Sequence, residues 1–126
     1  MAKYAHIDVL DGGLNVIKTG ATKMLLVSAY TAADSYAVVT GNKLAEVTMA
    51  SGDYTLAGTS SRTLTVASGK TATATASASG TPDLHIAFTD GVSKVLWVTD
   101  ETSNQPITSG NTVNFPAPVY TANQPT

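Results

Sequence analysis

The chain has 126 residues, which suits one domain with one hydrophobic core. Hydrophobic residues make up 43% of it, which indicates a folded protein rather than a disordered one. The net charge is −2, and the seven Lys and Arg residues are dispersed. Direct nucleic-acid binding is therefore not expected, because phosphate recognition needs clustered cations. The absence of cysteine excludes disulfides, thiolate catalysis and thiolate zinc sites.

The first twenty residues are predicted to form an amphipathic helix. Its aliphatic residues recur every three or four positions: Ile7, Leu10, Leu14 and Ile17. Two consecutive glycines, Gly12 and Gly13, weaken this helix by about 1 kcal/mol each, so it is expected to depend on packing. The N-terminus lacks the pattern of a signal peptide. Apolar runs such as MLLV are too short to span a bilayer, so we expect synthesis in the cytoplasm and no membrane partner.

The rest of the chain shows mainly β patterns. The run MLLVSA, residues 24–29, is continuously apolar and predicts a strand buried on both faces, and residues 33–39 are predicted as a short helix. Further strands are expected at 44–49, 54–57, 62–67, 70–79, 84–89, 94–99 and 113–115. We therefore predict a mainly β fold, an antiparallel β-sandwich or small barrel with an N-terminal α-helix packed on it. Residues 1–115 form the single domain, and the Pro-rich residues 116–126 form an extended C-terminal arm.

The stretch GKTATATASASG, residues 69–80, has the Gly-Lys-Thr of a phosphate-binding loop. That motif requires a glycine at the position of Leu64 and a helix after the threonine. Leu64 lies in a predicted strand, and the alternation of Thr or Ser with Ala has the period of a strand. The prediction is a hairpin turn at Ser68-Gly69 followed by a strand, with Lys70 in solvent.

No enzymatic site is predicted. Neither His6 nor His85 belongs to a recognisable triad or metal motif, and no G-x-S-x-G sequence is present. His85 is interpreted as a surface or interface residue, because it alternates with the apolar Leu84 and Ile86. The acidic residues near 90 and 100 fit turns better than a glycosidase pair. We therefore expect no cofactor and no metal, and Trp97 is interpreted as a core residue.

The order of these elements resembles a family of small structural proteins of tailed bacteriophages. The segments that carry this resemblance are VLDGGLNVIKTGATKMLLVSAYTAADSYAVVT, SRTLTVAS and SGTPDLHIAFTDGVSKVLWVTDETSNQPITSGNTVNFPAPVY. The resemblance covers most of the chain, although TAADSY and the plain GKTATATASAS strand depart from the family pattern. It implies a virion component, a capsid decoration (cement) protein that binds the major capsid protein lattice in many copies.

Two alternatives stay open at this point: a head-to-tail connector or tail component, and a carbohydrate- or surface-binding β-sandwich module. Copy number per virion separates a decoration protein from a connector, and exposed aromatic residues or a metal site would favour the sugar-binding module. The charged share of only 13% fits a surface partly covered by partners, and also fits a secreted β-domain. The residues predicted to contact partners are Tyr4, His85, Phe115, Val119 and Tyr120.

Overall fold

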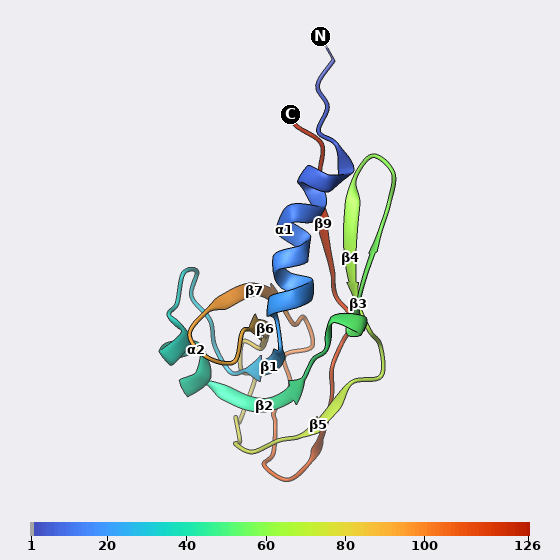
Figure 1. Cartoon of the computed structure of the whole chain (residues 1–126). Coiled ribbons are helices and arrows are strands. Elements are labelled where there is room, and N and C mark those ends of the chain that lie inside the picture. The colour runs from blue at the N-terminus through green and yellow to red at the C-terminus, as the bar shows by residue number, and fades with distance from the viewer. Residues whose placement is uncertain (1) are drawn as a thin grey trace.

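The structure is a computed structural model that describes residues 2–126 (Figure 1). Two α-helices and nine strands follow one another in the described chain, with a 3₁₀ turn at Ser51–Asp53. In chain order they are α1 (Ile7–Gly20), β1 (Lys23–Val27), α2 (Tyr36–Gly41), β2 (Lys43–Thr48), β3 (Tyr54–Ala57), β4 (Arg62–Val66), β5 (Thr71–Thr73), β6 (His85–Thr89), β7 (Val95–Asp100), β8 (Thr112–Asn114) and β9 (Val119–Ala122). The fold is mainly β, with antiparallel sheets arranged as in a sandwich and an N-terminal helix, as the sequence predicted. Over residues 2–126 the sheets do not close into a barrel.

The largest sheet has the strand order β2-β1-β6-β7, with every pair antiparallel. Its central strand β1 is buried from Met24 to Val27, which confirms a strand covered on both faces. Met24 and Leu26 belong to the main hydrophobic core. Leu25 and Val27 face the other way and pack with Val39 of α2 in a smaller core. The continuous apolar run is therefore explained by two cores, one on each face of the sheet.

Helix α1 packs on the second sheet, whose strand order is β3-β4-β9. Leu14 and Ile17 of the predicted aliphatic stripe are buried, whereas Ile7 and Leu10 of the same stripe are only partly buried. At the C-terminal end of the helix, the buried Tyr54 hydroxyl donates a 2.7 Å hydrogen bond to the carbonyl of Ala21. Nearer the N-terminal end of the helix, Arg62 of β4 donates two hydrogen bonds, of 2.7 and 3.0 Å, to the Asp11 carboxylate. These polar contacts fix the helix, which two internal glycines would otherwise weaken, against the sheet.

Residues 116–126, which the sequence predicted as an extended arm, are attached to the domain by a strand. They contain β9, which pairs antiparallel with β4 in a register that places Tyr120 opposite Leu64. After the strand, the Gln124 amide donates to the carbonyl of Ala5 and accepts from its N–H, and it also donates to the Ser60 carbonyl. The two ends of the described chain therefore lie together at one end of the molecule (Figure 1).

The Thr- and Ala-rich stretch is only partly a regular strand. β5 covers Thr71–Thr73 and pairs with β8, so the hairpin predicted between β4 and β5 does not form. An isolated bridge joins Ala78 to Ile107. The predicted alternation is nevertheless present, because the alanines from 72 to 78 face inward while the hydroxyl residues between them are exposed.

Lys70 is not free in solvent, as the sequence had predicted, because its Nζ lies 2.9 Å from the Asp53 carboxylate. That carboxylate also accepts a 2.8 Å hydrogen bond from the backbone N–H of Ala50. The Ala50 hydrogen bond and, after it, the Lys70 contact hold the pKa of Asp53 below its usual value. The Lys70–Asp53 ion pair connects the turn after β4 to the 3₁₀ turn before β3.

The hairpin predicted at Asp90-Gly91 is confirmed between β6 and β7. Gly91 has φ +76°, and the Asp90 carboxylate accepts hydrogen bonds from the three backbone N–H groups of residues 92–94. These bonds lower the pKa of Asp90, those from Lys94 and Ser93 being the strongest causes. Helix α2 begins at Tyr36, later than predicted, because the Ser35 hydroxyl caps it by accepting from the Val38 N–H.

Candidate interaction surface

Large apolar side chains are exposed along helix α1 and strand β9. Val9 and Val16 on the helix are 69% and 56% exposed, and Val119 and Tyr120 on the strand are 53% and 41% exposed. We call Val9, Val16 and Tyr120 the α1–β9 surface. Val119 points to the other face of β9, because side chains alternate along a strand and Val119 is opposite the exposed Thr65. The helix and the strand are in contact, so their exposed residues lie on neighbouring elements (Figure 1). Neighbouring exposed apolar residues of this kind are typical of surfaces that bind another molecule.

A groove of about 270 Å³ runs between α1 and β9. Its walls include Leu10 and Val16 from the helix, Leu96 from β7, and Tyr120 from β9. Gly13 also lines it, and a β-carbon added there would meet no atom within 4 Å. An alanine at this position would therefore fit without a collision.

The aromatic ring of Tyr120 is anchored to the core although it is half-exposed. It meets Trp97 edge-on with ring centroids 5.4 Å apart. Trp97 in turn stacks on the buried Phe88 with a centroid separation of 4.6 Å. Aromatic residues held in this way contribute contact area with little loss of conformational entropy, which is a property of residues at the centre of protein interfaces.

Strand β9 also has an unpaired edge. The N–H of Val66 in β4 donates to the Pro118 carbonyl, so the alternation of an antiparallel ladder directs the backbone groups of Val119 and Thr121 away from β4. No charged residue lies within β9. Edge strands of soluble proteins are usually protected by charges, bulges or covering segments. This edge can therefore accept a further strand.

A second concave region, which we call the β8 pocket, has a volume of about 490 Å³. Its floor includes the buried core residues Leu84, Ile86 and Phe115, and its rim includes Glu101, Ser103 and Gln105. An apolar floor with a few polar groups at the rim is the usual composition of a binding pocket.

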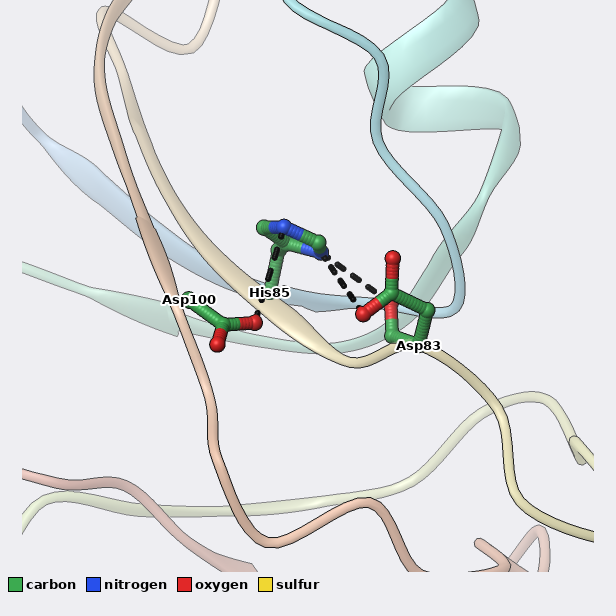
Figure 2. A group of neighbouring side chains, drawn as sticks. All are labelled: Asp83, His85 and Asp100. Carbon is green, nitrogen blue, oxygen red and sulfur yellow. Dashed lines mark hydrogen bonds and ion pairs between the residues drawn. The ribbon is translucent and has the colours of Figure 1, made fainter.

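Asp83, His85 and Asp100 lie together at the open end of β6 and β7 (Figure 2). His85 and Asp100 are directly opposite in the register, and the His85 Nε2 lies 3.7 Å from an Asp100 carboxylate oxygen. The His85 Nδ1 lies 3.0 Å from the backbone carbonyl of Asp83, and the ring of Tyr30 is 5.6 Å away. One ligand atom from each of the three residues lies within 4.8 Å of the others, so these are the side chains that could approach a cation. Both carboxylates are largely exposed and so remain hydrated, and the cluster is best described as a polar cross-strand contact.

Among the described residues, no helix is long and apolar enough to span a bilayer. No family model, curated protein or solved structure matches the chain. The function of the protein is therefore inferred from its surfaces.

The structure separates the five residues that were predicted to contact partners. Val119 and Tyr120 are consecutive in β9 and point to opposite faces of the strand, and Tyr4 is 70% exposed on the segment before α1. The side chain of His85 is only 16% exposed and lies in the acidic cluster, away from the α1–β9 surface. Phe115 is 6% exposed and packs in the main core, where it lies on the floor of the β8 pocket and not on the outer surface. Since Val113 and Phe115 share one face of a strand, burial of one implied burial of the other.

Sequence reasoning missed Val9 and Val16, and it did not join His85 to its two aspartates. The signal for the valines was present, since both lie off the aliphatic stripe that buries Leu14 and Ile17. For the acidic cluster, the register of the Asp90-Gly91 hairpin would have placed position 85 opposite position 100.

Proposed function

We propose that this protein is a structural component of a tailed-bacteriophage virion, a capsid decoration protein that binds and stabilises the lattice of the major capsid protein. The observation that carries this proposal is the α1–β9 surface. The resemblance of the sequence to small phage structural proteins supports the same assignment. A multi-copy position on the capsid would also fit the low charge of the chain, since protein contacts would cover part of its surface.

Two modes of attachment are available on this surface. The unpaired edge of β9 can accept an extended segment of a capsid subunit as an added strand, through backbone hydrogen bonds. The groove beside it, with Tyr120 and Val16 on its walls, can bind an apolar side chain of the same segment. Because the protein would bind the assembled lattice and not dispersed subunits, it would stabilise the assembled state by mass action.

The experiment that tests this proposal uses capsids purified without the protein. Purified protein is added back, and binding and the temperature of capsid disruption are measured. We expect saturable binding and a higher disruption temperature. Failure of the protein to bind, or an unchanged disruption temperature, would contradict the decoration function.

Substitutions on and away from the α1–β9 surface identify the part of the protein that contacts the capsid. Val16→Asp places a charge on the α1–β9 surface and should weaken capsid binding at least tenfold. Val38→Asp is the matched control, because Val38 is 48% exposed on α2, in a different part of the molecule. Both substitutions should change the free energy of unfolding by less than about 0.5 kcal/mol, as is usual for exposed positions. Equal loss of binding in the two variants would assign the contact to another surface.

The number of copies per virion distinguishes this function from that of a connector. A decoration protein should be distributed over the whole shell, whereas a connector forms one ring at a single vertex. Quantitative mass spectrometry of purified virions, relative to the major capsid protein, measures this ratio.

A further inference from the structure

The β8 pocket offers a binding site for an extended segment. The backbone groups of β8 that face β5 are those of residues 111, 113 and 115, as the hydrogen bonds from the Phe115 N–H to Lys70 and from the Ala74 N–H to Asn111 show. Thr112 and Asn114 therefore direct their N–H and C=O groups to the opposite side, and both residues line the pocket. The pocket thus has a free strand edge along one wall and an apolar floor.

The polar groups at the rim restrict the occupant further. Glu101 is the one charged residue among those described as lining the pocket, so a cationic side chain would be favoured there. Ser103, Gln105 and Asn114 provide side-chain hydrogen-bond partners. A tyrosine matches this arrangement, because its ring needs apolar surroundings and its hydroxyl needs a polar partner when buried. The volume of about 490 Å³ is within the usual range of about 300–1,000 Å³ for ligand pockets.

The chain itself carries such a segment before α1. Residues 2–4 belong to no helix or strand and are exposed, and they include Lys3 and the 70% exposed Tyr4. The hydrogen bonds between Ala5 and Gln124 fix the point from which this segment projects. A projecting segment with one cation and one aromatic side chain complements a pocket with core residues at its floor and polar groups, including one carboxylate, at its rim.

The segment cannot reach the pocket of its own chain. Three extended residues span about 10 Å, whereas the 14-residue α1 alone is about 21 Å long. In Figure 1 the N-terminus and β5, the partner of β8, lie at opposite ends of the molecule, with α1 on the side of the N-terminus. Any occupancy of the pocket by this segment must therefore be between molecules.

We propose that the N-terminal segment of one copy binds in the β8 pocket of a second copy, with Tyr4 in the pocket, Lys3 at Glu101 and the backbone alongside β8. Because the segment and the pocket are different surfaces, the contact is heterologous and joins copies head to tail. Repetition of the contact would produce a ring or an open chain of copies. The proposal goes beyond attachment to a capsid, and it does not depend on it.

The absence of cysteine from the sequence allows a direct test. Two single variants, Tyr4→Cys and Ser103→Cys, are purified separately, mixed, oxidised mildly and analysed on a non-reducing gel. We expect the mixed disulfide to form at least tenfold faster than in a mixture of Tyr4→Cys with Val92→Cys. Val92 is a suitable control because it is 77% exposed on the β6–β7 turn. Equal rates in the two mixtures would overturn the proposal.

Self-association is measured in parallel by sedimentation equilibrium over a range of protein concentrations. Tyr4→Ala should raise the dissociation constant at least tenfold. Lys3→Glu and Glu101→Lys should each weaken association, and the double variant should recover most of the loss, which a general effect on folding would not do. A wild-type chain that stays monomeric at all concentrations would overturn the proposal while leaving the capsid-binding function intact.

Discussion

The hydrogen bond between Tyr54 and Ala21 joins the end of α1 to the second sheet, and its removal should have a measurable cost. In Tyr54→Phe the ring stays in place, including its edge-on contact with Phe88 at a centroid distance of 6.2 Å, so little cavity is created. The carbonyl of Ala21, a residue only 2% exposed, loses its partner. An unpaired buried polar group costs about 1–3 kcal/mol, and we expect a loss of stability in this range.

Urea unfolding followed by the fluorescence of the single tryptophan, Trp97, measures this loss. The midpoint should fall by roughly 1 M with an unchanged slope, because the surface exposed on unfolding is the same. Tyr36→Phe is the matched control, since the Tyr36 hydroxyl makes no hydrogen bond among the described residues, and it should change stability by less than about 0.5 kcal/mol. A Tyr54→Phe variant that unfolds at the same urea concentration as the wild type would refute the reasoning.

The pH dependence of stability provides an independent test of the same residue. Burial, and secondarily the negative charge of Asp53, raise the pKa of Tyr54. The folded state therefore retains the phenol proton more strongly than the unfolded state. The resulting stability is fully present below the usual tyrosine pKa of about 10 and is lost as the pH rises above it. The wild type should lose stability at alkaline pH more steeply than Tyr54→Phe.

Three further predictions concern stability alone. The pKa of Asp53 is lowered in the folded state, so its carboxylate stabilises the fold at neutral pH, and this stabilisation is lost below about pH 4. In urea titrations the wild type and Asp53→Asn should therefore converge in stability as the pH falls from 5 to 3. Measured by thermal unfolding, Gly58→Ala should destabilise the protein far more than Gly69→Ala. Both glycines have positive φ, but a β-carbon at Gly58 would collide with the Ser61 carbonyl, whereas one at Gly69 would meet no atom within 4 Å. Equal losses of stability in the two variants would contradict this. Gly12→Ala should stabilise the protein by about 1 kcal/mol in urea unfolding, because the position is an exposed helix interior with open space, and a loss of stability would contradict the packing described for α1.

Features with local signals were predictable from the sequence. The strand at Tyr54–Ala57 was predicted with its observed bounds, and the hairpin at Asp90-Gly91 was predicted from its turn dipeptide. The aliphatic spacing predicted the buried residues Leu14 and Ile17 of α1. Each of these features depends on neighbours within a few residues, where propensity and periodicity act directly.

Features that depend on distant pairing were not predictable in this way. The segment PAPVYTANQPT has the composition of an extended arm, and nothing within it indicates that VYTA pairs with β4, more than fifty residues earlier. The same applies to β5, whose alternation predicted its inward and outward faces but not its partner β8. The α1–β9 surface combines residues from the first and last parts of the chain. The sequence therefore does not show that its valines and its tyrosine lie close together.

The Gln124 contact with Ala5 brings the ends of the described chain together, and this has a practical consequence for engineering. Circularly permuted versions, in which a short linker joins residue 126 to residue 2 and new termini open at the Asp90-Gly91 turn, should keep the same sheets, since no strand is interrupted. Such a permutant would tether the segment that carries Tyr4 while leaving the β8 pocket open. A display tag placed at the new termini would extend from the β6–β7 turn instead of from the end of the molecule where residues 2 and 126 lie.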